Sequence, residues 1–252
     1  MQIQLIRNAT LRIDYAGYEF VIDPYLAAKY TRPSYAGKSP NPLVELPCSP
    51  LEVIAGVELV LISHLHSDHF DPAAQDLLPK DMTIFCQPGD EAVIQAKGFS
   101  QVTPVRDSLR WQDLTITRTP GQHGTGEVLQ QMGPVSGFVF QADTEPTVYW
   151  AGDTIWYEAV RSVIAHMQPD FIITHSSGAV WGDSVLIVMD AEQTVAVCRA
   201  APNSIVMATH MDALDHGTIS REALRAYADS AGISPEQLRI PADGEILSFN
   251  LG

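Results

Sequence analysis

The chain has 252 residues, of which 46% are hydrophobic and 18% charged, as is ordinary for a globular enzyme with a large core. Its formal net charge of −15 repels phosphate backbones, so nucleic acid is a poor general partner. No apolar run reaches the length of about 18 residues that predicts a transmembrane helix. Residues 1–7 also lack the basic and apolar regions of a signal peptide.

These features predict a cytoplasmic protein without a membrane segment that acts on a small-molecule substrate. The three cysteines, Cys48, Cys86 and Cys198, form no C-x-x-C pair and are expected to be free thiols in a reducing compartment. The oligomeric state is left open, with a homo-oligomer as one possibility.

Strands and helices alternate along the first half of the chain. Strands are predicted at residues 2–6, 10–15, 19–22, 57–62, 83–87 and 114–119, and helices at 71–78 and 89–97. Residues 27–50, rich in Pro, Tyr, Ser and Gly, fit neither periodicity. A loop this long is usually functional or disordered. Its aromatic and basic residues, Tyr30, Arg32, Tyr35 and Lys38, favour a flap that contacts a ligand, and a packed surface excursion is the alternative.

The second half repeats this style. Strands are predicted at residues 137–142, 147–151, 170–174, 204–209 and 245–250, and helices at 157–167, 191–201 and 221–230. Asp190 and Ser220 are expected N-caps, with Gln193 as the capping-box partner of Asp190. The two similar halves, roughly residues 1–125 and 126–252, predict a single α/β domain in which two stacked sheets are flanked by helices.

Ligand-type side chains follow several of the predicted strands directly. The residues in question are His64, Asp68, His123, Asp153 and His210. Side chains at the ends of rigid apolar strands can converge at one edge of a sheet, and sites built in this way hold their geometry well. We therefore expect these five residues to meet.

The run from His64 to His69 is the strongest of these signals, because it places four ligand-type side chains within six residues. Imidazole and carboxylate groups are ligands of zinc, iron and manganese. One metal cannot easily take all four from so short a loop. We expect His64 and His66 to serve one metal, and Asp68 and His69 a second. A histidine-rich surface turn is the alternative.

The H-x-H-x-D-H arrangement of residues 64–69 resembles the signature of the metallo-β-lactamase fold superfamily. Further motifs follow in that family's order, namely Ile22-Asp23-Pro24, Gly121-Gln122-His123-Gly124, Ala151-Gly152-Asp153-Thr154 and His210. The resemblance covers essentially the whole chain and implies a four-layer αββα sandwich. It also implies that one metal is bound by His64, His66 and His123, that the second is bound by Asp68, His69 and His210, and that Asp153 bridges them.

Within that superfamily, the chain looks most like the single-domain hydrolases similar to L-ascorbate-6-phosphate lactonases. The segment at residues 41–47 resembles an uncharacterised bacterial and fungal subgroup of this branch. The lactonase-like relatives often carry Gly-His-Ala near the first strand, whereas this chain has Arg7-Asn8-Ala9. This departure weakens a lactonase assignment.

Two neighbouring divalent ions, most readily zinc, with manganese or iron as alternatives, would lower the pKa of a shared water towards about 7 and supply hydroxide. Asp68 is expected to orient that hydroxide and move its proton, with His69 as the other catalytic residue. Asp23 is expected to fix a ligand from behind, although a simple Asp-Pro turn explains it equally well. Substrate contacts are predicted for His175, His216 and Tyr35.

The resulting hypothesis is a metal-dependent hydrolase that cleaves an ester, lactone or related acyl bond in a small metabolite. Hydrolysis of a small phosphodiester is the first alternative, because the same pair of ions can perform it. A non-catalytic protein that binds a metal or ligand is the second.

Overall fold

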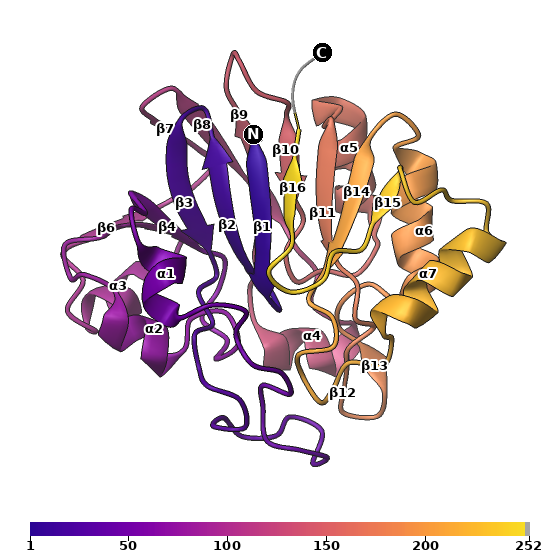
Figure 1. Cartoon of the computed structure of the whole chain (residues 1–252), viewed down its shortest axis with the longest axis horizontal. Helices are drawn as coiled ribbons and strands as arrows, with labels where there is room; N and C mark the ends of the chain where they lie inside the picture. Colours follow the sequence, from indigo (N-terminus) through magenta and orange to yellow (C-terminus); the bar gives the residue numbers. More distant parts are fainter. Residues whose placement is uncertain (250–252) are drawn as a thin grey trace.

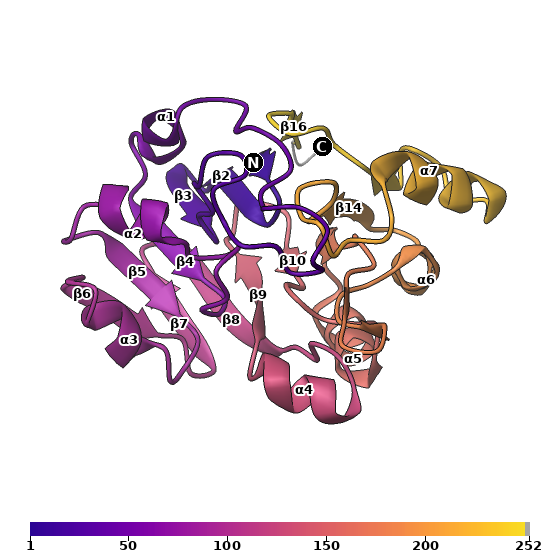
Figure 2. The ribbon, with the colours of Figure 1, turned by 90° about the horizontal axis from the view of Figure 1, so that it is seen from below.

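The computed structural model describes residues 1–249, which form two seven-stranded sheets packed face to face with helices on the outside (Figure 1). Viewed from below, α1, α2 and α3 lie outside one sheet and α5, α6 and α7 outside the other (Figure 2). The predicted αββα sandwich is confirmed. No helix in this part of the chain is both long and apolar enough to cross a membrane.

The first sheet joins the N-terminal strands to a single strand from the end of the chain. Its strand order is β16-β1-β2-β3-β4-β5-β6, with antiparallel pairing from β16 to β3 and parallel pairing from β3 to β6. The strands are β1 (Gln2–Arg7), β2 (Thr10–Tyr15), β3 (Tyr18–Ile22), β4 (Leu59–Ile62), β5 (Thr83–Cys86), β6 (Gln101–Pro104) and β16 (Ile246–Ser248). Three short helices follow in this half, α1 (Pro50–Ile54), α2 (Pro72–Leu77) and α3 (Glu91–Gln95).

The second sheet has the order β15-β14-β11-β10-β9-β8-β7, and its strands β10, β11, β14 and β15 run parallel. The strands are β7 (Ser108–Trp111), β8 (Leu114–Pro120), β9 (Ser136–Gln141), β10 (Val148–Trp150), β11 (Phe171–His175), β14 (Ile205–Thr209) and β15 (Leu238–Arg239). The helices of this half are α4 (Gly126–Met132), α5 (Glu158–Met167), α6 (Ala191–Ala200) and α7 (Arg221–Ser230), and β12 (Val180–Trp181) pairs with β13 (Val185–Leu186) in a small hairpin.

Strand β4 illustrates how the layers are held together. Successive side chains of a strand point to opposite faces of the sheet. Accordingly, Leu59 and Leu61 pack into the core between the sheets, while Val60 and Ile62 pack into the core beneath the helices. All four are fully buried. A strand covered on both faces reads as a continuous apolar run, and that run positions the histidine cluster that follows it.

Most predicted elements are present with ends shifted by one or two residues, and the capping prediction is half right. Asp190 accepts a hydrogen bond from the backbone N–H of Gln193 (2.9 Å), and Ser220 caps α7 through Ala223. The capping box at Asp190 is wrong, because the side chain of Gln193 instead accepts from the backbone N–H of Trp156 (2.7 Å). The last residue of the predicted final strand, Asn250, lies outside the described residues.

The sequence analysis missed α1, α4 and the short strands β6, β7, β12, β13 and β15. Strands β6 and β7 alternate between exposed and partly buried residues at the sheet edges, where the apolar signal is weak. The long loop between β3 and α1 contains one isolated bridge, between Arg32 and Asn41. It hangs below the sheets at the same end of the molecule as α4 and the β12–β13 hairpin (Figure 1).

Candidate metal centre

The predicted ligands meet at one end of the sandwich because four strands from both sheets end there. His64 follows β4, His123 follows β8, Asp153 follows β10 and His210 follows β14. His66, Asp68 and His69 come from the loop between β4 and α2. Six of the seven side chains are buried, and His66 is partly exposed.

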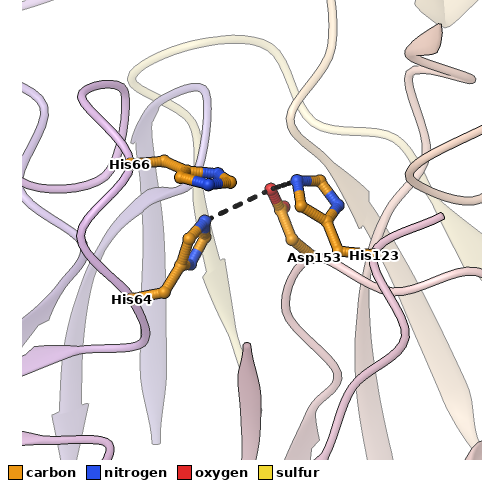
Figure 3. Close-up of side chains that lie close together, drawn as sticks. All are labelled: His64, His66, His123 and Asp153. Atoms are coloured by element: carbon orange, nitrogen blue, oxygen red, sulfur yellow. Dashed lines mark ion pairs between the residues drawn. The ribbon is translucent and has the colours of Figure 1, made fainter. Parts of the chain in front are cut away.

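One group of ligand atoms belongs to His64, His66, His123 and Asp153, whose atoms lie within 4.8 Å of one another. Oδ2 of Asp153 is 3.7 Å from Nε2 of His64 and 3.3 Å from Nε2 of His123 (Figure 3). The three rings face this oxygen from the two sheets.

A second group consists of Asp68, His69 and His210, within the same distance limit of 4.8 Å. Oδ2 of Asp68 is 3.2 Å from Nε2 of His210 and 3.5 Å from Nε2 of His69. Nε2 of His69 also lies 3.2 Å from Oδ2 of Asp153. The Asp153 carboxylate therefore lies between the two groups.

Hydrogen bonds on the outer side of the histidine rings determine which ring nitrogen has a lone pair available to bind a metal. His123 donates through Nδ1 to the carbonyl of Ile187 (2.7 Å), and His66 donates through Nε2 to the carbonyl of Met132 (3.0 Å). A carbonyl can only accept, so the proton must sit on the bonded nitrogen. Nε2 of His123 and Nδ1 of His66 are then left with a free lone pair.

Asp23 orients two further rings through one fully buried carboxylate. Its Oδ2 accepts from Nδ1 of His69 (2.7 Å) and from the hydroxyl of Ser63 (2.7 Å). Because the Ser63 proton is used in that bond, the Ser63 oxygen is free to accept from Nδ1 of His64 (2.8 Å). Nε2 of His64 thus faces the centre as a lone pair. Nε2 of His69 faces the same centre, and although burial alone would lower the pKa of this ring, the carboxylates of Asp153, Asp68 and Asp23 raise it well above its usual range.

The electrostatics of the centre favour positive charge. Burial alone would raise the pKa of Asp153, but His69, His123 and His210 hold it well below its usual range. Burial, followed by the nearby rings of His69 and His66, lowers the pKa of His64, so this ring is neutral, as a ligand must be. Three carboxylates, those of Asp23, Asp68 and Asp153, converge on His69. Buried carboxylates without a compensating cation are costly.

Two orphaned atoms test whether these residues fit a metal. Nε2 of His64 and Nε2 of His69 are buried without a hydrogen-bond partner among the described residues. A buried polar atom left unpaired costs free energy and calls for an explanation. A divalent ion explains both, and a nitrogen and oxygen donor set without thiolate suits zinc, manganese or iron. The residues therefore fit a metal site.

Asn8 has a structural role that the sequence analysis did not identify. Its side-chain amide donates to the backbone carbonyl of Asp68 (3.1 Å), and the backbone carbonyl of Asn8 accepts from the backbone N–H of His210 (2.9 Å). His210 has a positive φ of 61°, which is unusual for a residue other than glycine. Asn8 therefore links two predicted ligands and helps to hold one in a strained conformation.

The predicted substrate contact of His175 does not agree with the structure. The ring is fully buried, and its Nδ1 lies 2.5 Å from Oδ1 of Asp153. His175 is the last residue of β11 and lies behind the carboxylate, away from the cavity described next. Strand-end placement predicted the neighbourhood correctly but not the direction of the side chain.

A cavity of about 210 Å³ opens over the centre. Its lining includes neither lysine nor arginine and consists of Tyr35, His66, Ser67, Asp68, His123, Met132, Asp153, Trp181, Ile187 and His216. Tyr35 and His216, which were predicted to contact substrate, lie in this wall. The Tyr35 hydroxyl is 2.6 Å from Oγ of Ser67, and its ring meets that of His216 edge-on at 5.1 Å. Met132, Trp181 and Ile187 are wall residues that the sequence analysis missed.

Together with relatives described as hydrolases, the αββα fold and its histidine and aspartate centre define the class of this protein as metal-dependent hydrolase. The family described as the beta-lactamase superfamily domain matches residues 18–211. The UPF0173 protein YddR of Bacillus subtilis is 37% identical over 255 residues, which cover 99% of this chain and 100% of that protein. The chain belongs to the metallo-β-lactamase superfamily and, within it, to the UPF0173 proteins.

Two solved structures resemble the whole chain. An isothiocyanate hydrolase from Delia radicum gut bacteria has a TM-score of 0.92 and 35% identity, with 99% of each chain covered. A possible metal-dependent hydrolase from Veillonella parvula has a TM-score of 0.95 and 32% identity, again with 99% of each chain covered. None of these three relatives is described as a lactonase, so the lactonase-like branch stays a prediction.

Proposed function

We propose that this protein hydrolyses small, uncharged and largely apolar molecules at an electrophilic carbon. The observation that carries the proposal is the cavity wall, where Met132, Trp181 and Ile187 face the centre and no cationic side chain is present. Apolar walls with a few polar groups are typical of sites for small ligands. An anionic substrate would find no lysine or arginine to pair with, which makes a phosphodiester the weaker candidate.

We assign one metal to His64, His66 and His123, a second to Asp68, His69 and His210, and the position between them to Asp153. Zinc is the first choice, with manganese or iron as alternatives. Divalent ions held there would lower the pKa of a water towards about 7 and so provide hydroxide at neutral pH. The number of ions and their identity belong to the proposal.

The side chains then have distinct tasks. Asp68 is the catalytic carboxylate, because it lines the cavity and can accept and pass on a proton of the attacking water. His69, whose Nε2 faces the carboxylates of Asp68 and Asp153, contributes by helping to orient these two groups. Asp23 and His175 act from behind, by fixing His69 and Asp153 respectively. Tyr35 and His216 contact the substrate from the wall.

Two kinds of electrophilic carbon fit this arrangement. The first is the carbonyl of an ester, lactone or related acyl compound, as expected from the sequence. The second is the central carbon of an isothiocyanate, supported by the 35% identical hydrolase. In that reaction the water oxygen bonds to carbon, the carbon–nitrogen bond breaks, and nitrogen takes both water protons. The products are an amine and carbonyl sulfide. We favour the isothiocyanate because its neutral, rod-like group suits the apolar wall.

The test is metal analysis of the purified protein, followed by a substrate panel on the same sample. The panel contains benzyl isothiocyanate, p-nitrophenyl acetate, small lactones and bis-p-nitrophenyl phosphate. We expect amine release from the isothiocyanate, loss of this activity in Asp68→Ala, and normal activity in His166→Ala, whose ring is exposed on α5. Turnover of the phosphodiester alone would refute the proposal.

A further inference from the structure

The loop between β3 and α1 curls around one carboxylate, that of Asp215. Oδ1 accepts hydrogen bonds from the backbone N–H of Tyr35 (2.9 Å) and from Nδ2 of Asn41 (3.0 Å). Oδ2 accepts from the hydroxyl of Ser34 and from three backbone N–H groups, those of Ala36 (3.1 Å), Lys38 (3.2 Å) and Ser39 (3.3 Å). Six donors thus converge on one side chain.

The negative charge of the Asp215 carboxylate is stabilised by the dipoles of these N–H and O–H donors. Asp215 is 5% exposed, and no lysine or arginine in the described part of the chain forms an ion pair with it. Successive backbone N–H groups that point at one anion form a concave binding site for it. Burial alone would raise the pKa of Asp215, but its donors hold the pKa well below the usual range. The group is therefore ionised at neutral pH.

The same contact ties the loop to the segment that supplies His210 and His216. The backbone N–H of Asp215 donates to Oδ1 of Asn41 (2.9 Å), which makes the pairing of these two residues reciprocal. Leu43 adds a backbone hydrogen bond to Ala213 (2.8 Å). The tip of the loop is therefore fixed relative to the metal centre.

The base of the loop is held by a second buried charge. The guanidinium group of Arg7 donates to the carbonyls of Tyr25 (3.0 Å), Ala27 (2.8 Å) and Val44 (3.1 Å). Arg7 is fully buried at the end of β1. With its tip held by Asp215 and its base by Arg7, the loop is a fixed wall of the cavity. This favours a functional role for the loop over a packed surface excursion.

Tyr35 is the residue that this wall delivers to the cavity. Its backbone N–H is held by Asp215, while its hydroxyl is bonded to Ser67, which stands between His66 and Asp68 in the chain. Its ring packs edge-on against His216. The position of this aromatic surface therefore depends on a carboxylate that does not itself line the cavity.

We propose that Asp215 is a positioning residue, which sets substrate binding by holding Tyr35 in the cavity wall. The kinetic part of this proposal rests on the proposed function. A wall residue displaced by about 1 Å can cost on the order of 100-fold in rate. Asp215→Asn keeps the shape of the side chain but replaces an acceptor oxygen with an NH₂ group, which faces backbone N–H donors.

The first experiment is a double-mutant cycle with Asp215→Asn and Tyr35→Ala, measured on whichever substrate of the panel the wild-type protein hydrolyses fastest. We expect Asp215→Asn to lower kcat/KM by about tenfold, mainly through KM, and to add less than about twofold in the Tyr35→Ala background. Metal content should stay at the wild-type value. Ser34→Ala, which removes one donor, should give a smaller change in the same direction. Asp229→Asn, an exposed aspartate on α7, is the matched control.

The second experiment is hydrogen exchange, which needs no substrate and is independent of the reaction assigned to the centre. Asp215→Asn should expose the amides of residues 35, 36, 38 and 39, which donate to Asp215, whereas Tyr35→Phe should leave them protected. Unchanged protection in Asp215→Asn, additive effects in the cycle, or loss of metal would each overturn the proposal. A wild-type protein that hydrolyses nothing would refute the proposed function. Even then, unchanged amide protection in Asp215→Asn would separately refute the anchoring of the loop by Asp215.

Discussion

The carboxylate of Asp23 accepts the Nδ1 proton of His69 at 2.7 Å, although 46 residues separate the two in the chain. This contact fixes the tautomer of a ring whose other nitrogen faces Asp68 and Asp153. The contact explains why an Asp-Pro turn at the end of β3 belongs to the metal centre. It also shows that two of the proposed ligands, His69 and, through Ser63, His64, are oriented from behind by a residue of the first sheet.

Replacing Asp23 with asparagine should weaken metal binding by about 10- to 100-fold, because an amide can leave His69 in the wrong tautomer and no longer compensates a positive charge. Competition with a chromogenic chelator measures the change. Asp14→Asn, at an exposed position of β2, should bind metal normally. Wild-type affinity in Asp23→Asn would mean that the contact serves the fold alone.

Asn8→Ala should destabilise the protein by about 1–3 kcal/mol, because the Asp68 carbonyl loses its buried donor. The hydrogen bond from the His210 backbone to residue 8 uses the main chain and survives the substitution. Denaturant unfolding measures the loss of stability. We also expect a lower kcat, because the loop that carries Asp68 is no longer held by Asn8. A variant with wild-type stability and normal kcat would contradict this role of Asn8.

Trp181→Ala should raise KM for benzyl isothiocyanate by about tenfold and leave kcat nearly unchanged, because apolar wall area contributes binding that is equal in the ground and transition states. Tyr30→Ala is a suitable control, since Tyr30 belongs to the same loop as Tyr35 but is 54% exposed. Comparison with methyl isothiocyanate sharpens the test. A substrate too small to reach Trp181 should show no change in KM.

His216 gives the protein a pH-dependent loss of stability. Burial lowers the pKa of this ring to about 4, from an ordinary value of about 6.5. The unfolded chain therefore binds a proton that the folded chain refuses, and stability falls as the pH drops from about 6.5 to about 4. The full loss from this residue is roughly 3 kcal/mol. Urea unfolding at several pH values should show a smaller acid loss in His216→Gln than in the wild-type protein.

The sequence predicts the centre well where chemistry and strand ends coincide. His64, His123, Asp153 and His210 each follow an apolar strand, and parallel or mixed sheets bring such ends together. The cavity wall was less predictable. Trp181 and Met132 lie on β12 and α4, short elements without a periodic signal, and only tertiary packing brings them over the histidine and aspartate centre.

Side-chain direction accounts for the remaining differences. His175 was placed at the correct strand end, but whether its ring faces the cavity or the back of Asp153 depends on the register of β11 against β10 and β14. In the sequence, Asn8 is distinguished only by its departure from a family motif. Its bond to Asp68 joins residues 60 positions apart and has no local signature.

The origin of the ligands in the chain has one more consequence. His64, His66, Asp68 and His69 follow β4 of the first sheet, whereas His123, Asp153 and His210 follow β8, β10 and β14 of the second sheet. A chain cut between β6 and β7 would leave neither fragment with a complete set of ligands for either proposed metal. Divalent ions would then act as a crosslink between the two fragments, and the affinity of the fragments for each other would rise with metal concentration.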